Sequence, residues 1–188
     1  MGLAPYGNAN SKQVGQYIQN LKSEILKIQP DGSIWLNQKY FNYAAGLKMV
    51  SERKWEKLFG FKRRKPNEEI EQKHCNLGLA IQIITEEVML LMAKHAQEIT
   101  GAKNLCLAGG VALNCVANGK LEKANIFDSI FIQPAAGDAG GALGAALAVN
   151  HIYFEQNRNM VSPDLLQGSF LGPEISNLEI ENTIKQFS

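Results

Sequence analysis

The sequence predicts an α/β fold in which short parallel strands alternate with helices. Apolar strand-like runs lie at residues 104–108 and 129–133, and each is followed by a helical run, at residues 111–122 and 139–153. This order typically gives neighbouring parallel strands joined by helical crossovers, with the strands buried and a ligand crevice at their carboxyl ends. The 188 residues, 45% of them hydrophobic, suffice for one substantial domain core.

Residues 1–66 are expected to form an N-terminal segment of short helices and edge strands. Apolar residues keep a helical spacing over residues 12–28, until a proline and a glycine end the helix. The runs at residues 33–36 and 40–43 are aromatic or β-branched. They fit strands or an edge hairpin near the surface.

A short helix and a basic run complete this segment. Ser51 is placed to cap a helix that runs to residue 58, with Trp55 on its inner face and Gly60 as its stop. The dense basic run at residues 62–65 has two interpretations. A solvated loop before the next helix is favoured over a phosphate-facing arginine.

Residues 67–155 are expected to hold the ligand-binding α/β core, which begins with a long helix. Asn67 is placed to cap a helix over residues 68–100, and Gly101 ends it. At 1.5 Å per residue such a helix is about 50 Å long. It therefore either backs the whole sheet or carries a kink near Gly78.

The two ends of the chain have weaker signals. The apolar Gly/Pro turn at residues 1–7 is of a kind that connects two elements, so we expect an internal segment of a longer protein. Residues 156–188 are expected to form a C-terminal extension with one helix at residues 176–187.

The composition argues against several partner classes. Nineteen basic and 18 acidic residues give a net charge of +1, which favours neither nucleic acid nor an anionic membrane surface. The three cysteines, Cys75, Cys106 and Cys115, form no CxxC pair and are expected to be reduced core thiols of a cytoplasmic protein. The apolar run at residues 81–93 is interrupted by two glutamates, so neither a membrane span nor a signal peptide is expected.

Two glycine-rich turns, one after each predicted core strand, give the strongest functional signal. The first contains Gly109 and Gly110, and the second runs through residues 137–141 as Gly-Asp-Ala-Gly-Gly. A strand that ends at paired glycines and continues as a helix exposes backbone N–H groups where the helix dipole favours an anion. A tight packing turn is the alternative for either alone, but two such turns on adjacent strand ends favour a phosphate site.

Each turn has one polar side chain with two open interpretations. Asn114 lies one helical turn beyond Gly110, and either contacts a nucleoside or caps backbone. Asp138 either caps the following helix or holds a metal ion beside the phosphate. A metal site needs further ligands from elsewhere, and the three histidines are too far apart in the sequence to supply them convincingly. The sequence has no HExxH, HxxxH, Walker A or GxSxG motif.

Four sequence blocks carry a resemblance to a known family. They are MGLAPYG at residues 1–7, CLAGGVALNCVANGKL at 106–121, QPAAGDAGGALGAAL at 133–147 and FLGPE at 170–174. In this order they resemble the O-carbamoyltransferases of nodulation-factor and antibiotic carbamoylation, whose transferase domain is related to the ATPase that makes threonylcarbamoyladenosine on tRNA. The resemblance implies the actin/Hsp70/sugar-kinase-like (ASKHA) fold, mainly its second subdomain, with a mixed or parallel sheet flanked by helices.

The resemblance also implies a reaction and a set of site residues. A carbamoyl group passes from carbamoyl-adenylate, made from carbamoyl phosphate and ATP, to the hydroxyl of a small-molecule acceptor, with Fe²⁺ or another divalent metal bound. Asp138 matches a metal ligand of that family. The residues that match its nucleotide-binding positions are Gly2, Leu3, Gly109, Gly110, Val111, Asn114 and Gly137.

Other parts of that family's machinery have no counterpart in the 188 residues. Its HxxxH metal pair and general-base histidine lie upstream of the matching blocks, and its adenylating domain lies downstream, so the chain alone is expected to be inactive. Two alternatives stay open, an ATPase or phosphotransferase of the same fold that uses Asp138 with Mg²⁺, and a non-catalytic nucleotide-binding half. A half-domain exposes apolar surface, which makes self-association an expectation.

Overall fold

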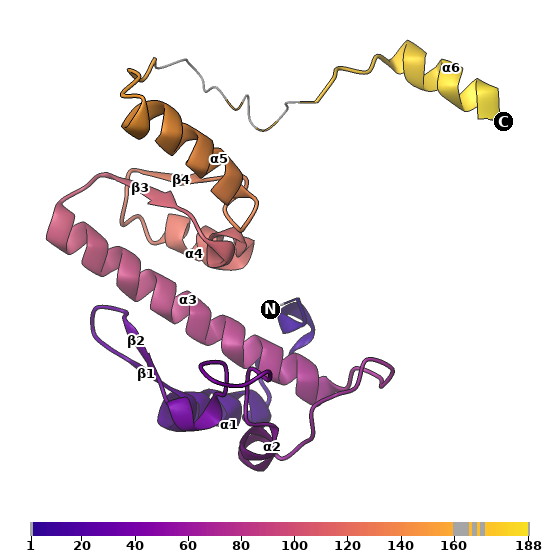
Figure 1. Cartoon of the computed structure of the whole chain (residues 1–188). Coiled ribbons are helices and arrows are strands. Elements are labelled where there is room, and N and C mark those ends of the chain that lie inside the picture. The colour runs from indigo at the N-terminus through magenta and orange to yellow at the C-terminus, as the bar shows by residue number, and fades with distance from the viewer. Residues whose placement is uncertain (1, 160–165, 167–168, 170–171, 188) are drawn as a thin grey trace.

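The structure is a computed structural model that describes residues 2–159, 166, 169 and 172–187 (Figure 1). Met1 of the first block and Phe170 and Leu171 of the last block lie outside the described residues. Two small sheets flanked by helices give a mixed α/β fold, which confirms the predicted α/β class, while the ASKHA fold stays a prediction. The long helix α3 (Gln72–Thr100) runs between the N-terminal elements and the strands that precede the glycine turns (Figure 1).

The region predicted as one helix over residues 12–28 divides into three elements. Helix α1 spans Lys12–Asn20, a π-helical turn η2 spans Leu21–Ile25, and strand β1 spans Leu26–Ile28. The helical prediction is wrong for the last three residues because they pair antiparallel with β2 (Ile34–Leu36). The ladder supplies the backbone hydrogen bonds that a longer helix would have made.

The aromatic run at residues 40–43 is not a strand. It begins within a short 3₁₀ helix, η3 (Gln38–Tyr40), and only Phe41 forms an isolated bridge, with Val50. The hairpin prediction is therefore correct for β2 but wrong here. Asn37 starts the 3₁₀ turn by accepting a hydrogen bond from the amide of Lys39, at 3.3 Å.

The short helix α2 (Glu52–Phe59) lies where the sequence predicted it. Gly60 ends it in the left-handed conformation, at φ 79°, as expected for a glycine stop. Ser51 occupies the cap position, but its side chain makes no capping hydrogen bond. The indole Nε1 of Trp55 donates to the carbonyl of Tyr40 at 3.0 Å, which ties α2 to η3.

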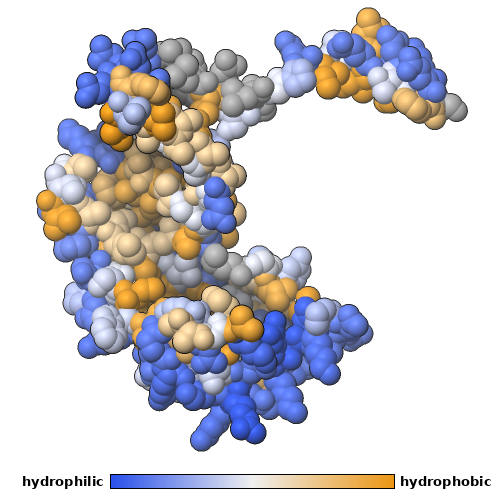
Figure 2. Space-filling view, in the orientation of Figure 1, coloured by the Kyte–Doolittle hydropathy of each residue, from blue (hydrophilic) through white to orange (hydrophobic). Residues whose placement is uncertain are grey.

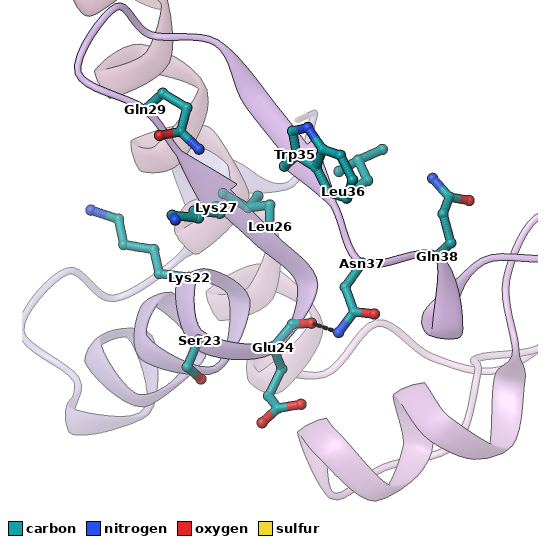
Figure 3. A pocket seen from close by; sticks show the side chains of 10 residues that line it. All are labelled: Lys22, Ser23, Glu24, Leu26, Lys27, Gln29, Trp35, Leu36, Asn37 and Gln38. Atoms are coloured by element: carbon teal, nitrogen blue, oxygen red, sulfur yellow. Dashed lines mark hydrogen bonds between the residues drawn. The ribbon is translucent and has the colours of Figure 1, made fainter.

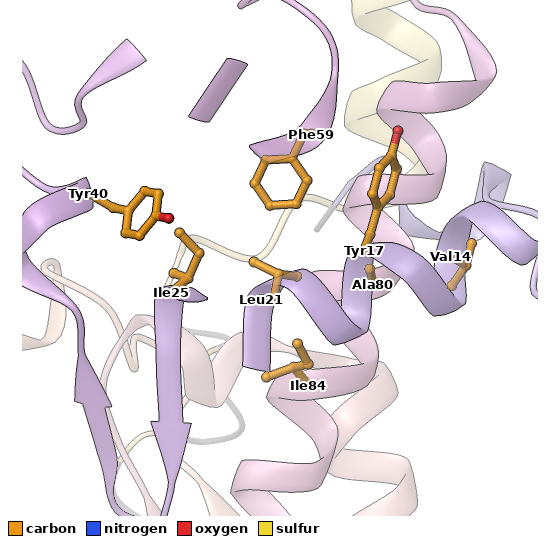
Figure 4. Close-up of a cluster of buried hydrophobic side chains, with 8 residues drawn as sticks. All are labelled: Val14, Tyr17, Leu21, Ile25, Tyr40, Phe59, Ala80 and Ile84. Carbon is orange, nitrogen blue, oxygen red and sulfur yellow. The ribbon is translucent and has the colours of Figure 1, made fainter. Parts of the chain in front are cut away.

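A hydrophobic core joins α1, η2, α2 and α3. Its buried side chains are Val14, Tyr17, Leu21, Ile25, Tyr40, Phe59, Ala80 and Ile84 (Figure 4). Each large member contributes about 1.5–3 kcal/mol by burial. At its edge the Tyr40 hydroxyl donates to Glu24 at 2.7 Å, and this bond, with a second from Lys39, holds the pKa of the Glu24 carboxyl below its ordinary value.

Helix α3 starts later than predicted, at Gln72 rather than residue 68. Asn67 is not its cap; Glu71 is, in a reciprocal capping box with His74, whose Nδ1 accepts from the Glu71 amide at 2.9 Å. A turn occupies the preceding residues, because the Arg64 guanidinium donates to three backbone carbonyls there. These bonds favour the loop interpretation of the basic run at residues 62–65.

Helix α3 is unbroken and ends at Gly101 in the left-handed conformation, as predicted. There is no kink at Gly78: a Cβ at that position would lie 3.3 Å from the Cβ of Leu3, so this glycine admits the N-terminal turn. The main neighbours of α3 are that turn, α1 and the helix α4 (Cys115–Lys123). It therefore does not back a large sheet, which was the other expectation.

By length and composition alone, α3 is also apolar enough to cross a membrane. Over an 18-residue window its mean hydropathy is 1.4, and 33% of that window is buried within the chain. A core helix passes the same test, so this is weak evidence for a span. The expectation that the chain has no membrane span stays a prediction.

Strands β3 (Asn104–Leu107) and β4 (Ser129–Ile132) pair in parallel, with α4 as the crossover between them. This confirms the predicted strand, helix, strand order. The expectation of a buried strand is wrong, because alternate β3 residues are exposed and Cys106 lies opposite Phe131, whose side chain is 52% exposed. No described element covers this face of the pair.

The remaining helices follow the second strand. The helical run predicted over residues 139–153 is α5 (Gly140–Ala148), continued by a π-helical turn η5 (Val149–Tyr153). The last helix is α6 (Asn177–Phe187), as predicted. The cysteine prediction is only partly correct: all three thiols are free, Cys75 is buried, but Cys106 and Cys115 are exposed rather than in the core.

Candidate functional site

The two glycine turns lie side by side at the carboxyl ends of β3 and β4. The amide of Gly109 donates to the carbonyl of Ala136 at 2.7 Å, which links the first turn directly to the second. A Cβ on Gly137 would lie 3.8 Å from the Leu113 side chain. The expected juxtaposition of the turns is thus confirmed, since parallel strands end at one edge of a sheet.

Gly109 gives the first turn its shape. Its backbone has φ 99° and ψ 160°, a conformation that only glycine adopts without strain. The chain then enters a 3₁₀ helix, η4 (Gly110–Leu113), whose first amides, of Gly110 and Val111, have no acceptor within the helix. A Cβ on Gly110 would meet nothing within 4 Å, so open space lies beside these amides.

Asn114 separates η4 from α4, so the helix predicted over residues 111–122 is two elements. Its Oδ1 accepts from the amide of Ala117 at 3.1 Å, which makes it the cap of α4. Its side chain also pairs with that of Gln82 on α3, through Gln82 Nε2 to Asn114 Oδ1 at 3.1 Å and Asn114 Nδ2 to Gln82 Oε1 at 3.0 Å. The capping interpretation is confirmed, and nucleoside contact stays a prediction.

The sequence analysis missed several polar residues around this turn. Gln82 and Glu86 are each only 5% exposed, whereas the sequence analysis counted Glu86 only as a charge that interrupts an apolar run. The carboxylate of Glu86 accepts from Gln82 Nε2 at 2.8 Å and pairs with the ammonium of Lys120 on α4. Their four-residue spacing places both side chains on one helix face, but the sequence does not show that this face is buried.

Asn118, one turn beyond Asn114 on α4, also holds the glycine turn. Its Nδ2 donates to the carbonyl of Ala112 in η4 at 2.7 Å. Among the described residues, its Oδ1 is buried without a hydrogen-bond partner. The turn is thus bound through side chains from both α3 and α4.

Asp138 lies at the tip of the second turn with its side chain exposed. The capping interpretation is wrong, since Ala139 occupies the cap position of α5 and no side chain caps that helix. The turn is tight: a Cβ on Gly140 would lie 2.1 Å from the carbonyl oxygen of Ala135, so only glycine fits. Because the Asp138 side chain is exposed and does not cap α5, its carboxylate is available to a ligand.

A complete metal site does not appear among the described residues. No three His, Cys, Asp or Glu side chains gather there in a way that could hold an ion. Divalent ions in proteins take at least four ligands, so Asp138 can supply one of them but cannot form the site by itself. The residues present therefore fit a metal only as a partial ligand set.

The N-terminal turn approaches the same stretch of α3. Its 3₁₀ helix η1 (Ala4–Tyr6) is held by Gln72, whose Nε2 donates to the carbonyl of Tyr6 at 2.9 Å. Leu3 is half-buried near Gly78, while Gly2 is exposed. Because Gly78 and Gln82 are one helical turn apart, about 6 Å along the axis, the N-terminal turn and the glycine turn contact successive turns of α3.

Two pockets flank the β1–β2 hairpin. One, of about 640 Å³, lies on its outer face beside Trp35, which is 74% exposed, and no predicted site residue lines it (Figure 3). The other, of about 460 Å³, is almost wholly apolar and lies between the hairpin, α3 and the glycine turn. Val111 and Ala112 line it, so the glycine turn has one apolar side.

Comparison with known proteins identifies the family. A family model described as the carbamoyltransferase N-terminus matches residues 1–147. The chain is 47% identical over 185 residues to the uncharacterized protein sll1178 of Synechocystis sp., covering 98% of this chain and 29% of that protein. It is 43% identical over 104 residues to nodulation protein NolNO of Sinorhizobium fredii, covering 55% of the chain and 15% of that protein.

A third relative agrees. Nodulation protein NolO of Bradyrhizobium diazoefficiens is 44% identical over 103 residues, which cover 55% of this chain and 19% of NolO. The chain thus spans less than a third of the length of each of these relatives. The match to the family model covers most of the chain and includes both glycine turns. The chain therefore belongs to the carbamoyltransferase family.

Proposed function

We propose that this chain supplies the phosphate-binding turns and one metal ligand of an O-carbamoyltransferase. That enzyme would transfer a carbamoyl group from carbamoyl-adenylate, made from carbamoyl phosphate and ATP, to the hydroxyl of a small-molecule acceptor. The observation that carries the proposal is the hydrogen bond from Gly109 to Ala136, which joins two glycine turns in a carbamoyltransferase-family chain. The proposed setting is the second subdomain of an ASKHA fold in a cytoplasmic protein.

Each site residue has a proposed part. The amides of Gly110 and Val111 bind nucleotide phosphate, because a turn that enters a helix presents donors to an anion. The N–H of Gly109 is already bonded to Ala136, so Gly109 contributes the bend rather than a donor. The other proposed nucleotide contacts are Gly2, Leu3, Asn114 and Gly137.

Asp138 is proposed as one ligand of Fe²⁺ or another divalent cation. Its carboxylate is exposed, and the backbone carbonyl of the same residue accepts from the amide of Gly141 at 3.1 Å. Such a metal ion, when bound, would polarise the carbamoyl carbonyl. The further ligands would come from other parts of a longer protein, a proposal supported by the 29% of the sll1178 relative that this chain spans. The chain alone is accordingly proposed to be inactive.

Calorimetry and a turnover assay test this proposal. ATP or AMP titrated into the chain is expected to bind, with loss of binding in the Gly109→Ala variant. In the complete protein that carries this segment, turnover is expected to require both carbamoyl phosphate and ATP. ATP hydrolysis that does not depend on carbamoyl phosphate would support the ATPase alternative. If neither the chain nor the complete protein binds nucleotide, the proposal is contradicted.

Self-association of this chain is a further expectation. Neither α5 nor α6 buries a residue, and Ile152, Tyr153 and Phe187 are each more than three-quarters exposed. Figure 2 shows weakly apolar surface gathered over the half of the molecule around α5, while the N-terminal half is mostly hydrophilic on this face. Patches of this kind favour association. Sedimentation velocity is expected to give a mass that rises with concentration, and a monomer throughout would contradict this.

A further inference from the structure

Two polar side chains are buried on α3 where packing alone would favour apolar ones. Gln82 and Glu86 are each 5% exposed and face α4. Burial of a carboxylate is costly unless it is paired and hydrogen-bonded, and a well-packed apolar residue is often as stable there. Packing therefore does not explain why these two side chains are polar, and the explanation must lie in the hydrogen bonds that they make.

The bonds form a relay that begins at the surface and ends at the glycine turn. The ammonium of Lys120, on a side chain that is 54% exposed, pairs with Glu86 Oε2. Glu86 Oε1 accepts from Gln82 Nε2 at 2.8 Å, and the Gln82 amide then pairs with that of Asn114 in both directions. Every bond in this relay involves side chains rather than the regular helix backbone.

The relay has a fixed direction because an ionised carboxylate only accepts hydrogen bonds. Glu86 therefore requires the Nε2 of Gln82 to face it. With that orientation set, Gln82 presents Oε1 to Asn114 Nδ2, and Asn114 Oδ1 is left to accept from Gln82 and from the amide of Ala117, at 3.1 Å each. The charge of Glu86 thus sets the orientation of the Gln82 amide, and that orientation matches the one in which Asn114 caps α4.

Asn114 in turn fixes the end of the glycine turn. Its backbone amide donates to the carbonyl of Val111 at 3.0 Å and closes η4, while its side chain starts α4. The proposed phosphate-binding amides of Gly110 and Val111 belong to that same four-residue 3₁₀ helix. A change in the orientation of Asn114 would move them.

We infer that Gln82, Glu86 and Lys120 are positioning residues, which hold the Gly110–Leu113 helix in its anion-binding form through the side chain of Asn114. The expected effect of these residues on anion binding rests on the proposed function. Their expected effect on the conformation of the turn does not. These residues touch no ligand themselves. Their effect is expected in the local order of the turn and in phosphate affinity.

Matched substitutions on α3 test the inference in the full chain. Glu86→Gln keeps the size of the side chain but adds a donor, so it no longer dictates the orientation of Gln82. The control is Glu87→Gln, which removes the same charge one residue later from a surface pair with Lys22. Lys120→Met removes the ammonium at the half-exposed end of the relay, and Lys120→Arg keeps that positive charge.

The measurement is amide hydrogen exchange at residues 110–117 without ligand, followed by ATP affinity from calorimetry. Glu86→Gln and Lys120→Met are expected to speed exchange there about tenfold and to weaken ATP binding by a similar factor, because a hydrogen bond near a charge is lost. Glu87→Gln and Lys120→Arg are expected to match the unaltered chain, with unchanged exchange in α1.

The outcomes separate this inference from the proposed function. Exchange at the turn that is equal in all variants overturns the inference, whatever the nucleotide result. Exchange that changes uniformly over the whole chain also overturns it, because that result indicates a general stabilising role. Faster exchange confined to the turn supports the positioning role even if the unaltered chain binds no ATP, because the exchange measurement is made without nucleotide.

Discussion

Replacement of Gly109 by alanine is expected to destabilise the chain by about 1–3 kcal/mol, because the new side chain must adopt a backbone region that is essentially restricted to glycine. The residue has φ 99° and ψ 160°. If the strain is relieved by a changed turn, the amides of η4 move and ATP affinity is expected to fall at least about tenfold. Urea unfolding gives the change in stability, and calorimetry gives the change in affinity.

Gly110→Ala is the matched control for this prediction. Gly110 has no left-handed backbone, and a Cβ there would meet nothing within 4 Å. The free energy of unfolding of the Gly110→Ala variant is therefore expected to stay within about 0.5 kcal/mol of the value for the unaltered chain, as for most substitutions without a structural conflict. Equal destabilisation by both variants would show that the turn does not depend on the conformation of Gly109.

Loss of the Asp138 carboxylate is expected to have the largest effect on activity. In the complete protein that carries this segment, Asp138→Ala is expected to lower bound metal and to reduce carbamoyl transfer by more than about 100-fold, since even indirect ligand supports are worth 10–100-fold. The fold should survive, because this side chain is exposed and makes no capping bond to α5. Elemental analysis and a transfer assay measure the two effects.

Asp128→Ala provides the comparison for Asp138. Asp128 is another exposed aspartate, in the loop before β4, and its structural contact is the backbone bond from its amide to the carbonyl of Lys103, at 2.8 Å. Metal content and transfer are expected to be unchanged in this variant. Unchanged metal content in Asp138→Ala would remove Asp138 from the ligand set.

The features predicted correctly from the sequence are those determined by local chemistry. Gly60 and Gly101 stop their helices because glycine adopts the left-handed conformation without a Cβ clash. The parallel pairing of β3 and β4 follows from the short crossover through α4, which returns the chain in the same direction. The adjacency of the two glycine turns then follows from that pairing.

The features predicted wrongly depend on hydrogen-bond partners and covering elements that the residue pattern does not reveal. The last residues of the region at 12–28 become a strand because β2 offers a ladder. Helix α3 begins late because the carbonyls that would have extended it are bound by Arg64. Burial of β3 was inferred from its apolar residues, but burial also requires a covering element, and none of the described ones covers that face.

The candidate site divides in the same way. Gly109, Gly110 and Asp138 could be selected from the sequence because glycines flanking a strand end, and a carboxylate among them, are unusual locally. Gln82, Glu86 and Lys120 could not, because a glutamine and a glutamate on a long helix resemble solvated residues until the neighbouring helix is placed. Only their burial against α4 identifies them as part of the turn's support.

The sequence by itself determined the α/β class, the order of strand and helix around the glycine turns, and the residues able to form a phosphate turn beside a carboxylate. These properties follow from periodicity and from the conformational freedom of glycine, which act over a few residues. Three features depend on the tertiary structure. The Gly109 amide donates to the carbonyl of Ala136, Asn114 caps α4, and the buried carboxylate of Glu86 on α3 orients the amide of Gln82 that bonds Asn114. Hydrogen bonds between distant residues require packed helices, and the packing exists only in the folded chain.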